Sequence, residues 1–337
     1  MQKTTVNIGV IGVGHLGQYH VKHYRKLKDT NLIGIYDSDH SRSKQISKKF
    51  GVPYFSHIEK LIKKVDAVSI VTPTLTHAQI AEYCINKNIH VFIEKPITTT
   101  VEEADRILSL ANTLSVIVQV GHIERLNPGL LALQNYNLKP KFIEIQRLAP
   151  YTTRGTDVPV VLDKMIHDID IVLSIANSNV KSIQASGLSI LTDSIDIANA
   201  RIRFKNGTIA SLTSSRIAQV ELRKIKIFGK NFYATIDLLL GSTELYTVVK
   251  KPTDVPRAIK TKEFEYRNKK TLIAYEKPKI IVKDSLRMEL LNFVKSIKGE
   301  SEPIVSGEKN TYTRFPKRLR LFSRQNQLRK YRWIYCC

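Results

Sequence analysis

The sequence predicts an α/β protein with two domains. The first is a doubly wound parallel sheet, and the second is an α+β domain with an open, mostly antiparallel sheet. Short apolar segments alternate with helical segments as far as His122, which is the pattern of a parallel sheet with crossover helices. A glycine-rich turn joins the first strand to the first helix, whereas the stretch from Val180 to Phe264 reads as successive strands without a helical pattern.

Length and composition are those of an ordinary globular protein. A chain of 337 residues exceeds what one core usually spans, and 42% hydrophobic and 25% charged residues are typical values. No apolar run has the length of a membrane span, and the polar start from Met1 to Thr5 predicts no signal peptide. Cys84, Cys336 and Cys337 form no disulfide framework and have no metal-ligand neighbours. We therefore expect a cytoplasmic protein without a metal site.

The net charge of +23 is large and unevenly distributed. Nine lysines and arginines, and no acidic residue, follow from Lys309 onward. The remaining excess is spread along the chain and forms no basic block with interleaved aromatic residues, which a nucleic-acid module would need. We expect no nucleic-acid partner for the body of the protein.

The first strand and helix enclose a dinucleotide-binding turn. The apolar strand Val6–Ile11 runs into Gly12, Gly14 and Gly17, with His15 and Leu16 inside the turn, and a helical stretch over 18–27 follows. In this context the first glycine permits the tight turn, the second lets the backbone approach a pyrophosphate, and the third allows the helix to pack on the strand. The start of the helix offers free N–H groups to phosphates.

An acidic residue follows the second strand at the expected spacing. Asp37 comes 20 residues after Gly17, where a carboxylate accepts hydrogen bonds from a ribose diol and repels a 2′-phosphate. Asp39 adds to this repulsion, so NAD is favoured over NADP, although Arg42 lies close enough to leave NADP open. The alternative is that Asp37 is a turn residue or the cap of the next helix.

Polar residues follow the later parallel strands. Thr72-Pro73, Glu94-Lys95 and His122 each end a predicted strand. Because the carboxyl ends of parallel strands share one edge, these side chains are expected to line one crevice. For Glu94 and Lys95 the alternative is a surface ion pair fixed by the proline that follows. For His122 it is a packed, hydrogen-bonded residue.

A later helix carries a second set of charged residues. It is predicted from about Pro159 to Ala176, and Asp163 and His167 lie one turn apart, with Asp170 continuing the same stripe. The alternative is an ordinary amphipathic helix with a solvated face. Beyond it, Asn206-Gly207 predicts a hairpin turn between two strands.

These motifs together resemble the glucose-fructose oxidoreductase/inositol dehydrogenase/rhizopine-catabolism (Gfo/Idh/MocA) family. The resemblance covers roughly residues 5–308 and rests on the following motifs: Gly12–Gly17, Thr72-Pro73-Thr74 with His77, Glu94-Lys95-Pro96, and Asp163 with His167. Residues 13–17, 120–128 and 154–157 resemble the branch of UDP-N-acetylglucosamine 3-dehydrogenases, which supply the diamino sugar of lipid A.

The resemblance implies an NAD(P)-dependent oxidoreductase that oxidises a sugar hydroxyl to a ketone. Lys95, His167 and Asp163 are then the expected catalytic residues, and either Lys95 or His167 is the base. Thr72, Pro73, His77, Glu94 and Lys95 join the glycine turn and Asp37 around the cofactor. The expected substrate contacts are Arg154, Asp157, His122, Arg125 and Asn199.

The same resemblance implies a homodimer or homotetramer formed through the open sheet, and a pyridoxal-phosphate (PLP) aminotransferase as neighbour in the pathway. Two other readings stay open: another sugar or polyol dehydrogenase of the family, and a non-catalytic NAD-binding regulator like the galactose-regulon repressor.

The end of the chain departs from the family pattern. We expect a nucleotide-binding domain over 1–124, a substrate and oligomerisation domain over 125–308, and an atypical tail over 309–337. The abrupt shift to a basic, acid-free composition there suggests a reading-frame change near residue 309. The alternative is a basic tail for an anionic membrane surface or nucleic acid.

Overall fold

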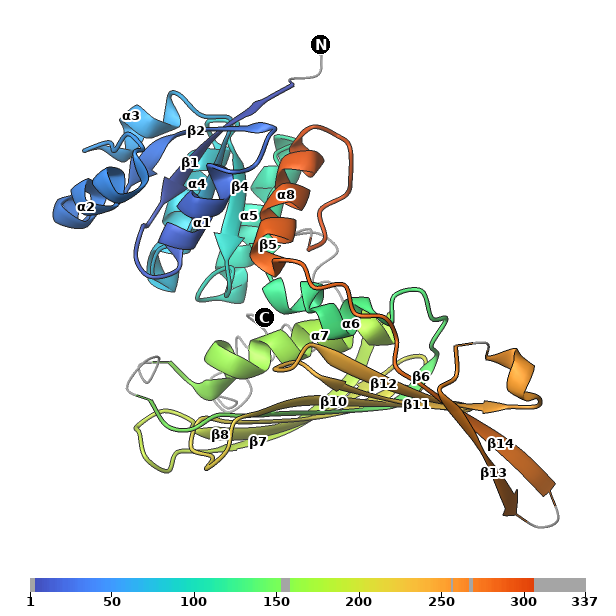
Figure 1. Cartoon of the computed structure of the whole chain (residues 1–337). Coiled ribbons are helices and arrows are strands. Elements are labelled where there is room, and N and C mark those ends of the chain that lie inside the picture. Colours follow the sequence, from blue (N-terminus) through green and yellow to red (C-terminus); the bar gives the residue numbers. More distant parts are fainter. Residues whose placement is uncertain (1–3, 153–157, 256, 267–268, 306–337) are drawn as a thin grey trace. The chain divides into compact units, whose positions relative to one another are not determined.

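The chain forms two compact units. The computed structural model describes residues 4–152, 158–255, 257–266 and 269–305 (Figure 1). Of the described residues, the first unit comprises 4–123 together with 284–305, and the second comprises those between them. The last helix, α8 (Ser285–Ile297), therefore belongs to the first unit, whereas the sequence-based boundaries placed it in the second domain. The basic tail lies outside the described residues.

The first unit is built on a five-stranded parallel sheet in the order β2-β1-β3-β4-β5. Its strands are β1 (Val6–Ile11), β2 (Thr30–Tyr36), β3 (Ala67–Ile70), β4 (His90–Glu94) and β5 (Val118–Gly121). Because β1 pairs with β2 on one side and with β3 on the other, the strand order reverses there. Ligands in doubly wound sheets bind at such a switch point, beyond the carboxyl ends of the strands.

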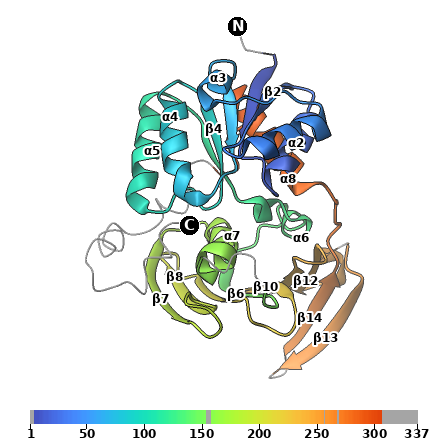
Figure 2. The same ribbon diagram turned by 90° about the vertical axis from the view of Figure 1, so that its left-hand side faces the viewer.

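Helices cover both faces of this sheet (Figure 2). Alternate residues of one strand show the two layers, since Phe92 packs with α1 (Gly17–Tyr24) and α8, whereas Val91 and Ile93 pack with α4 and α5. The remaining helices of the unit are α2 (His40–Phe50), α3 (Ile58–Ile62), α4 (His77–Ile85) and α5 (Val101–Thr113). The predicted doubly wound arrangement is confirmed.

Local signals account for where these helices begin and end. Thr100 and Glu103 form a reciprocal capping box at the start of α5. Asp39 caps α2, its carboxylate accepting the N–H of Arg42 at 3.0 Å. Gly51 ends that helix in the left-handed region at φ 61°.

The second unit is a nine-stranded sheet in the order β13-β14-β12-β11-β10-β6-β9-β8-β7. β6 and β9 are parallel and every other pair is antiparallel, which confirms the predicted open, mostly antiparallel sheet. The strands are β6 (Pro140–Leu148), β7 (Val180–Leu188), β8 (Ile197–Phe204), β9 (Ile209–Ser215), β10 (Leu222–Gly229), β11 (Phe232–Asp237), β12 (Ser242–Val249), β13 (Lys260–Tyr266) and β14 (Lys269–Glu276).

Two parts of this unit differ from the sequence prediction. The β13–β14 hairpin was not predicted as two strands, because its lysines and glutamates leave little hydrophobic alternation. Between β5 and β6, the residues after Asn127-Pro128 favour a helix to about Asn135, but the helix that they form is the short α6 (Pro128–Leu131). The predicted turn at Asn206-Gly207 is confirmed, since Gly207 has φ 85° and joins β8 to β9.

The two faces of the large sheet differ in their side chains. On β6, Ile143 and Ile145 are buried on the side of α7 (Ile166–Ala176), and β8 buries Ala198, Ala200 and Ile202 in the same alternating way. Figure 1 shows α7 lying along the sheet. The opposite face carries a row of aromatic rings with neighbouring centroids 4.9–5.9 Å apart: Phe142, Phe228, Tyr233, Tyr246 and Tyr275.

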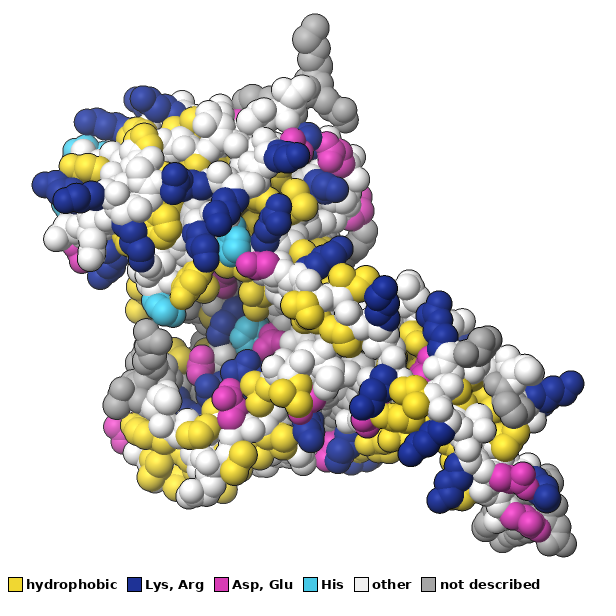
Figure 3. All heavy atoms as spheres, in the orientation of Figure 1, with side chains coloured by type: hydrophobic (Ala, Val, Ile, Leu, Met, Phe, Trp, Pro, Cys, Tyr) yellow, Lys and Arg dark blue, Asp and Glu magenta, His cyan; other side chains and the backbone are white. Residues whose placement is uncertain are grey.

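The surface of the first unit is rich in basic side chains. Figure 3 shows lysine and arginine side chains over the face that contains α1 and α2. Lys22 lies in the last turn of α1, and Lys48 and Lys49 lie in that of α2, where positive charge complements the helix dipole. In the described part of the chain, no helix combines the length and apolarity needed to span a bilayer.

Candidate active site

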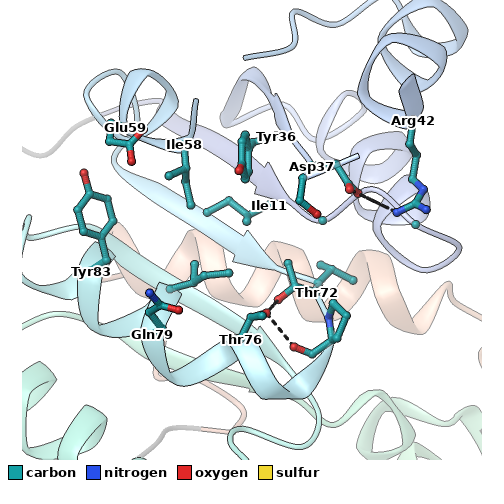
Figure 4. A pocket seen from close by; sticks show the side chains of 16 residues that line it. Ile11, Tyr36, Asp37, Arg42, Ile58, Glu59, Thr72, Thr76, Gln79 and Tyr83 are labelled. Atoms are coloured by element: carbon teal, nitrogen blue, oxygen red, sulfur yellow. Dashed lines mark hydrogen bonds and ion pairs between the residues drawn. The ribbon is translucent and has the colours of Figure 1, made fainter. Parts of the chain in front are cut away.

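A cavity of about 800 Å³ opens at the carboxyl edge of the parallel sheet. Its walls come from the ends of β1, β2 and β3 and from α3 and α4 (Figure 4). The lining residues are Ile11, Gly12, Gly14, Tyr36, Asp37, Ser38, Arg42, Ile58, Glu59, Val71, Thr72, Pro73, Thr76, Gln79, Ile80 and Tyr83. The cavity thus lies at the switch point between β1 and β3, where this fold binds nucleotides.

The three glycines of the turn meet three different requirements. Gly12 has φ 86°, and a Cβ there would lie 2.5 Å from the carbonyl oxygen of Val71. A Cβ on Gly17 would overlap the carbonyl oxygen of Gly12, so this glycine brings the helix close to the turn. Around Gly14 nothing lies within 4 Å of a Cβ, which leaves open space above the backbone. That space, at the start of a helix, suits a pyrophosphate.

Asp37 fixes the turn as well as facing the cavity. Its carboxylate accepts the N–H of Val13 at 2.8 Å and that of Asp39 at 2.9 Å, and only 5% of the residue is exposed. The guanidinium of Arg42 lies 3.3 Å from Asp37 and 3.2 Å from Asp39. Figure 4 shows the Asp37–Arg42 pair at one end of the cavity. Asp37 is therefore not the cap of α2, and its bonds to Val13 and Asp39 make it a structural residue of the turn as well as a residue of the cavity.

The Thr72-Pro73 segment lines the other side of the cavity. Thr76 donates its hydroxyl to the carbonyl of Pro73 and lies 2.8 Å from the hydroxyl of Thr72. His77, which begins α4, is 1% exposed and does not line this cavity. Its ring nitrogens each lie 2.9 Å from a carbonyl oxygen, Nδ1 from Pro96 and Nε2 from Thr72. Its contact with the cofactor stays a prediction.

Glu94 and Lys95 stand at the end of β4, next in the sheet to β3. Both are half-buried, and neither belongs to the lining of the cavity. The Glu94 carboxylate lies 3.1 Å from Nε2 of His20 and accepts the backbone N–H of Lys95 at 3.3 Å. Lys95 is joined to Pro96 by a cis peptide bond. The pair is therefore anchored to α1 and is not a free surface ion pair.

In the second unit, Asp163 and His167 lie on a helix that changes its winding. Residues Val161–Met165 form a turn of π-helix, and the regular α7 begins at Ile166, whereas the sequence predicted one α-helix from Pro159. Asp163 and His167 are half-buried, and Asp163 lies 3.4 Å from Lys164. π-Turns are frequent at functional sites because they re-aim side chains.

The other two acids of this helix are buried and paired with arginines. Asp168 lies 2.8 Å from Arg147 of β6, and Asp170 lies 2.6 Å from Arg125. Glu124 also lies 3.0 Å from Arg147, and although burial opposes the charge of this arginine, the two acids outweigh it and raise its pKa. Asp170 thus does not continue a solvated stripe; it anchors the segment after β5 to α7.

The predicted substrate contacts fall in different places. Arg125 is engaged by Asp170, and His122 is 2% exposed at the end of β5. Asn199 is exposed on the face opposite α7, where its amide donates to Leu212 and Thr213 of β9. The structure therefore does not bring Asn199 to the side of the sheet where His167 lies. Arg154 and Asp157 lie outside the described residues.

Several residues of the site carry no sequence signal of their own. Tyr36 at the end of β2 and Gln79 and Tyr83 on α4 line the cavity, and they come together only in the folded structure. His20 was read as part of an ordinary helix, although it lies three residues after Gly17 and faces Glu94. No cluster of three or more His, Cys, Asp or Glu side chains suited to a metal ion occurs within the described ranges.

Two family models match the chain. Residues 6–122 match the model described as "Oxidoreductase family, NAD-binding Rossmann fold", and residues 138–234 match the "GFO/IDH/MocA C-terminal domain". Each match falls within one of the two units described above.

Individual relatives agree with these models. The chain is 36% identical over 239 residues to UDP-N-acetylglucosamine 3-dehydrogenase of Acidithiobacillus ferrooxidans, covering 71% of this chain and 76% of the relative. A solved structure of that enzyme superimposes with a TM-score of 0.81 at 31% identity, covering 90% of this chain and 93% of the other. Myo-inositol 2-dehydrogenase of Thermotoga maritima is 27% identical over 323 residues, covering 90% of this chain and 91% of the relative. With its dinucleotide turn, its open sheet and these matches, the chain belongs to the Gfo/Idh/MocA family of NAD-binding oxidoreductases.

Proposed function

We propose that the protein oxidises the C3 hydroxyl of UDP-N-acetylglucosamine to a ketone, with NAD as the hydride acceptor. The observation that carries this proposal is the similarity to the UDP-N-acetylglucosamine 3-dehydrogenase of Acidithiobacillus ferrooxidans, at 36% identity and a TM-score of 0.81. It extends over both units, since the superposition covers 90% of this chain. The 3-keto sugar would then be converted to an amino sugar by a PLP aminotransferase, on the way to lipid A.

The first unit supports a bound dinucleotide. Gly14 leaves room for the pyrophosphate, and the start of α1 carries neither a side-chain cap nor an acidic residue, so its N–H groups and positive dipole suit an anion. When bound, the nicotinamide accepts the hydride from the sugar carbon. The residues of this chain bind and orient the cofactor and the sugar, and they move the hydroxyl proton.

Asp37 and Arg42 support a preference for NAD. The Arg42 guanidinium lies within 3.3 Å of two carboxylates, so its charge is largely balanced before any ligand arrives. A 2′-phosphate would add negative charge beside Asp37 and Asp39, whereas a ribose diol donates hydrogen bonds to Asp37. We therefore propose NAD rather than NADP as the working cofactor.

Lys95 and His167 are the proposed proton-handling residues. Oxidation of an alcohol requires a group that takes the hydroxyl proton while hydride leaves the carbon. The Lys95 ammonium, at the edge of the cofactor unit, is suited to hydrogen-bond the developing alkoxide. Imidazole has an unperturbed pKa near working pH, so we assign His167 as first candidate for the base. Asp163, one turn earlier, is placed to orient a histidine.

Another sugar or polyol dehydrogenase of the same family is the first alternative. The similarity to a myo-inositol 2-dehydrogenase runs over 90% of the chain, although at 27% identity. A non-catalytic NAD-binding regulator is the second alternative. The presence of Lys95, Asp163 and His167 together argues against it, because a regulator has no use for a complete proton-transfer set.

We also propose that the protein forms a homodimer or homotetramer through the open face of the large sheet. The row of five aromatic rings on that face includes Phe228, which is 37% exposed. Contiguous apolar surface of this kind commonly marks an interface between subunits. Light scattering coupled to size-exclusion chromatography should give the mass of two or four chains, and the mass of a single chain would contradict this assembly.

The proposed reaction is tested by NADH formation, followed by absorbance, in a screen of UDP-sugars and free polyols. We expect UDP-N-acetylglucosamine to be oxidised with NAD in preference to NADP. Oxidation of free inositols alone would favour the polyol dehydrogenase. NAD binding without reduction in the presence of any sugar would favour the regulator.

A further inference from the structure

Two buried histidines hold the Glu94-Lys95-Pro96 turn from opposite faces of the parallel sheet. His20 comes from α1, which packs on the same layer as Phe92, and His77 comes from α4, which packs on the layer of Val91 and Ile93. Neither histidine lines the cofactor cavity. His20 contacts Glu94 and His77 contacts Pro96, so both reach the turn directly.

His20 fixes the Glu94 side of the turn. Its side chain is completely buried, its ring meets Phe92 edge-on at 5.5 Å, and its Nε2 lies 3.1 Å from the Glu94 carboxylate. Because an ionised carboxylate only accepts hydrogen bonds, Nε2 is the protonated nitrogen. The Glu94 carboxylate also accepts the backbone N–H of Lys95 at 3.3 Å, so it restrains the backbone of Lys95 as well.

Gly121 closes the other side of the Glu94 carboxylate. It pairs with Glu94 in the β4–β5 register, and a Cβ on it would lie 2.9 Å from Oε1 and 3.0 Å from Oε2 of that carboxylate. A side chain at 121 would therefore have to push the Glu94 carboxylate aside. The glycine leaves room for that carboxylate between His20 and the backbone of β5.

His77 fixes the Pro96 side of the turn and ties it to the cofactor cavity. Its two ring nitrogens lie 2.9 Å from the carbonyl oxygens of Pro96 and Thr72. A carbonyl oxygen accepts and does not donate, so the imidazole ring is the donor side of this contact. Since Thr72 lines the cavity, this ring connects the residue after Lys95 to the cofactor-binding segment.

We propose that His20 and His77 are positioning residues that together hold Lys95 in one orientation relative to the cofactor-binding segment. The proposal deepens the function given above and rests on the role of Lys95 in it. Substituting a residue that only positions a catalytic group should change turnover more than cofactor binding. A displacement of about 1 Å in a catalytic group can cost about 100-fold in rate.

The test on α1 compares His20→Phe with His20→Gln. Phenylalanine fills the space but donates nothing, whereas the glutamine amide keeps a donor toward Glu94. We expect His20→Phe to lower kcat by about 10- to 100-fold while the Kd for NAD stays nearly constant, and His20→Gln to restore most of the loss. His23→Gln is the matched control, since His23 lies on the same helix near Asp284. It should leave kcat unchanged.

The test on α4 compares His77→Leu, which removes the polar ring, with His77→Gln, which retains a donor. We expect the larger loss of kcat in His77→Leu. Thermal unfolding monitors folding throughout. If a leucine or phenylalanine variant does not fold, the glutamine variants and the Kd for NAD still separate turnover from cofactor binding.

A measurement that needs no turnover probes Lys95 itself. Limiting acetic anhydride modifies lysines according to their environment, and mass spectrometry reports each site. We expect the rate at Lys95 to change several-fold in His20→Phe and His77→Leu, with exposed Lys87 as internal reference. Unchanged Lys95 labelling together with unchanged kcat in both variants would overturn the proposal. If the wild-type protein oxidises no sugar, yet both variants show the change in Lys95 labelling, the proposed function alone is refuted.

Discussion

The end of β4 and helix α7 both carry closely spaced charged residues, and they use them in different ways. Glu94 and Lys95 are half-buried at a sheet edge beside the nucleotide cavity, and Glu94 is held by a histidine and by backbone. On α7, Asp168 and Asp170 are buried and paired with arginines. His167, on the same helix, is only half-buried. Charged residues a few positions apart therefore differ in burial and in partners: Asp168 and Asp170 are buried in ion pairs, whereas Asp163 and His167, for which we propose a catalytic role, are half-buried.

The difference follows from what surrounds each charge. A buried carboxylate needs a charged partner, because its desolvation is otherwise too costly, and Arg147 and Arg125 supply that partner. A catalytic group must instead keep access to a substrate and accept a change of charge during the reaction. Substitutions of the two kinds of group should therefore differ: loss of a catalytic group lowers turnover, whereas loss of a buried ion-pair partner lowers stability.

Replacing Lys95 with alanine removes the group that we assign to the developing alkoxide. We expect kcat to fall by roughly 10²- to 10⁴-fold while NAD still binds, since proton-handling groups contribute about that much. Steady-state NADH formation and fluorescence titration with NADH measure the two quantities. Lys87→Ala, at an exposed position on the same unit, serves as control and should behave as wild type. Full activity in Lys95→Ala would remove this residue from the mechanism.

Replacing Arg147 with methionine leaves Asp168 and Glu124 without their shared cation. We expect the unfolding free energy of the second unit to drop by about 3–5 kcal/mol, which is typical when one member of a buried ion pair is removed. Urea denaturation measures it. Arg223, with a side chain 37% exposed, lies 3.5 Å from the same Glu124, and Arg223→Met should cost no more than about 1 kcal/mol. Equal losses in both variants would contradict the distinction between buried and exposed pairs.

Replacing Asp37 with serine tests the cofactor end of the first unit. We expect the Kd for NAD to rise by roughly 10- to 100-fold, because hydrogen bonds to a charged group contribute about 1.5–3 kcal/mol each. The affinity for NADP should change less, so the preference for NAD should shrink. Titration with both cofactors gives the ratio, and an unaltered preference would show that Asp37 only holds the glycine turn through Val13.

The smallest expected effect concerns pH and the folding of the first unit. Burial lowers the pKa of His90 below its ordinary 6.5, and Nδ1 of the ring accepts the N–H of Ile117 at 3.0 Å. The unfolded chain then binds more protons than the folded one, so the unfolding free energy should decline as pH falls below about 6.5. His90→Gln should weaken this decline. A thermal-denaturation series across that range checks it, and an identical slope in the variant would assign the effect elsewhere.

Sequence reasoning anticipated the parts of the structure that depend on local pattern. The glycine turn, the alternation of strands and helices and the turn at Asn206-Gly207 each follow from a few neighbouring residues. It could not assign Asp168 and Asp170, since their partners come from other elements, Arg147 from β6 and Arg125 from the segment after β5. The contact between His20 and Glu94 has the same origin, because the two lie 74 residues apart.

The π-turn before α7 was also beyond sequence reasoning. A helix with one widened turn has nearly the same hydrophobic periodicity as a regular one, so Val161–Met165 read as the first turn of an α-helix. The long charged hairpin of β13 and β14 escaped for another reason. Its strands owe their pairing to each other and to β12, and they bury few apolar side chains.

The most direct test of the central claim follows the hydrogen that leaves the sugar. UDP-N-acetylglucosamine carrying deuterium at C3 is incubated with the protein and NAD, and the reduced cofactor is analysed by mass spectrometry. The account predicts reduced cofactor that contains the deuterium, formed more slowly than from the unlabelled sugar if hydride transfer limits the rate. Reduced cofactor without deuterium would place the oxidation at another carbon, and no reduced cofactor at all would contradict the assignment of this sugar as substrate.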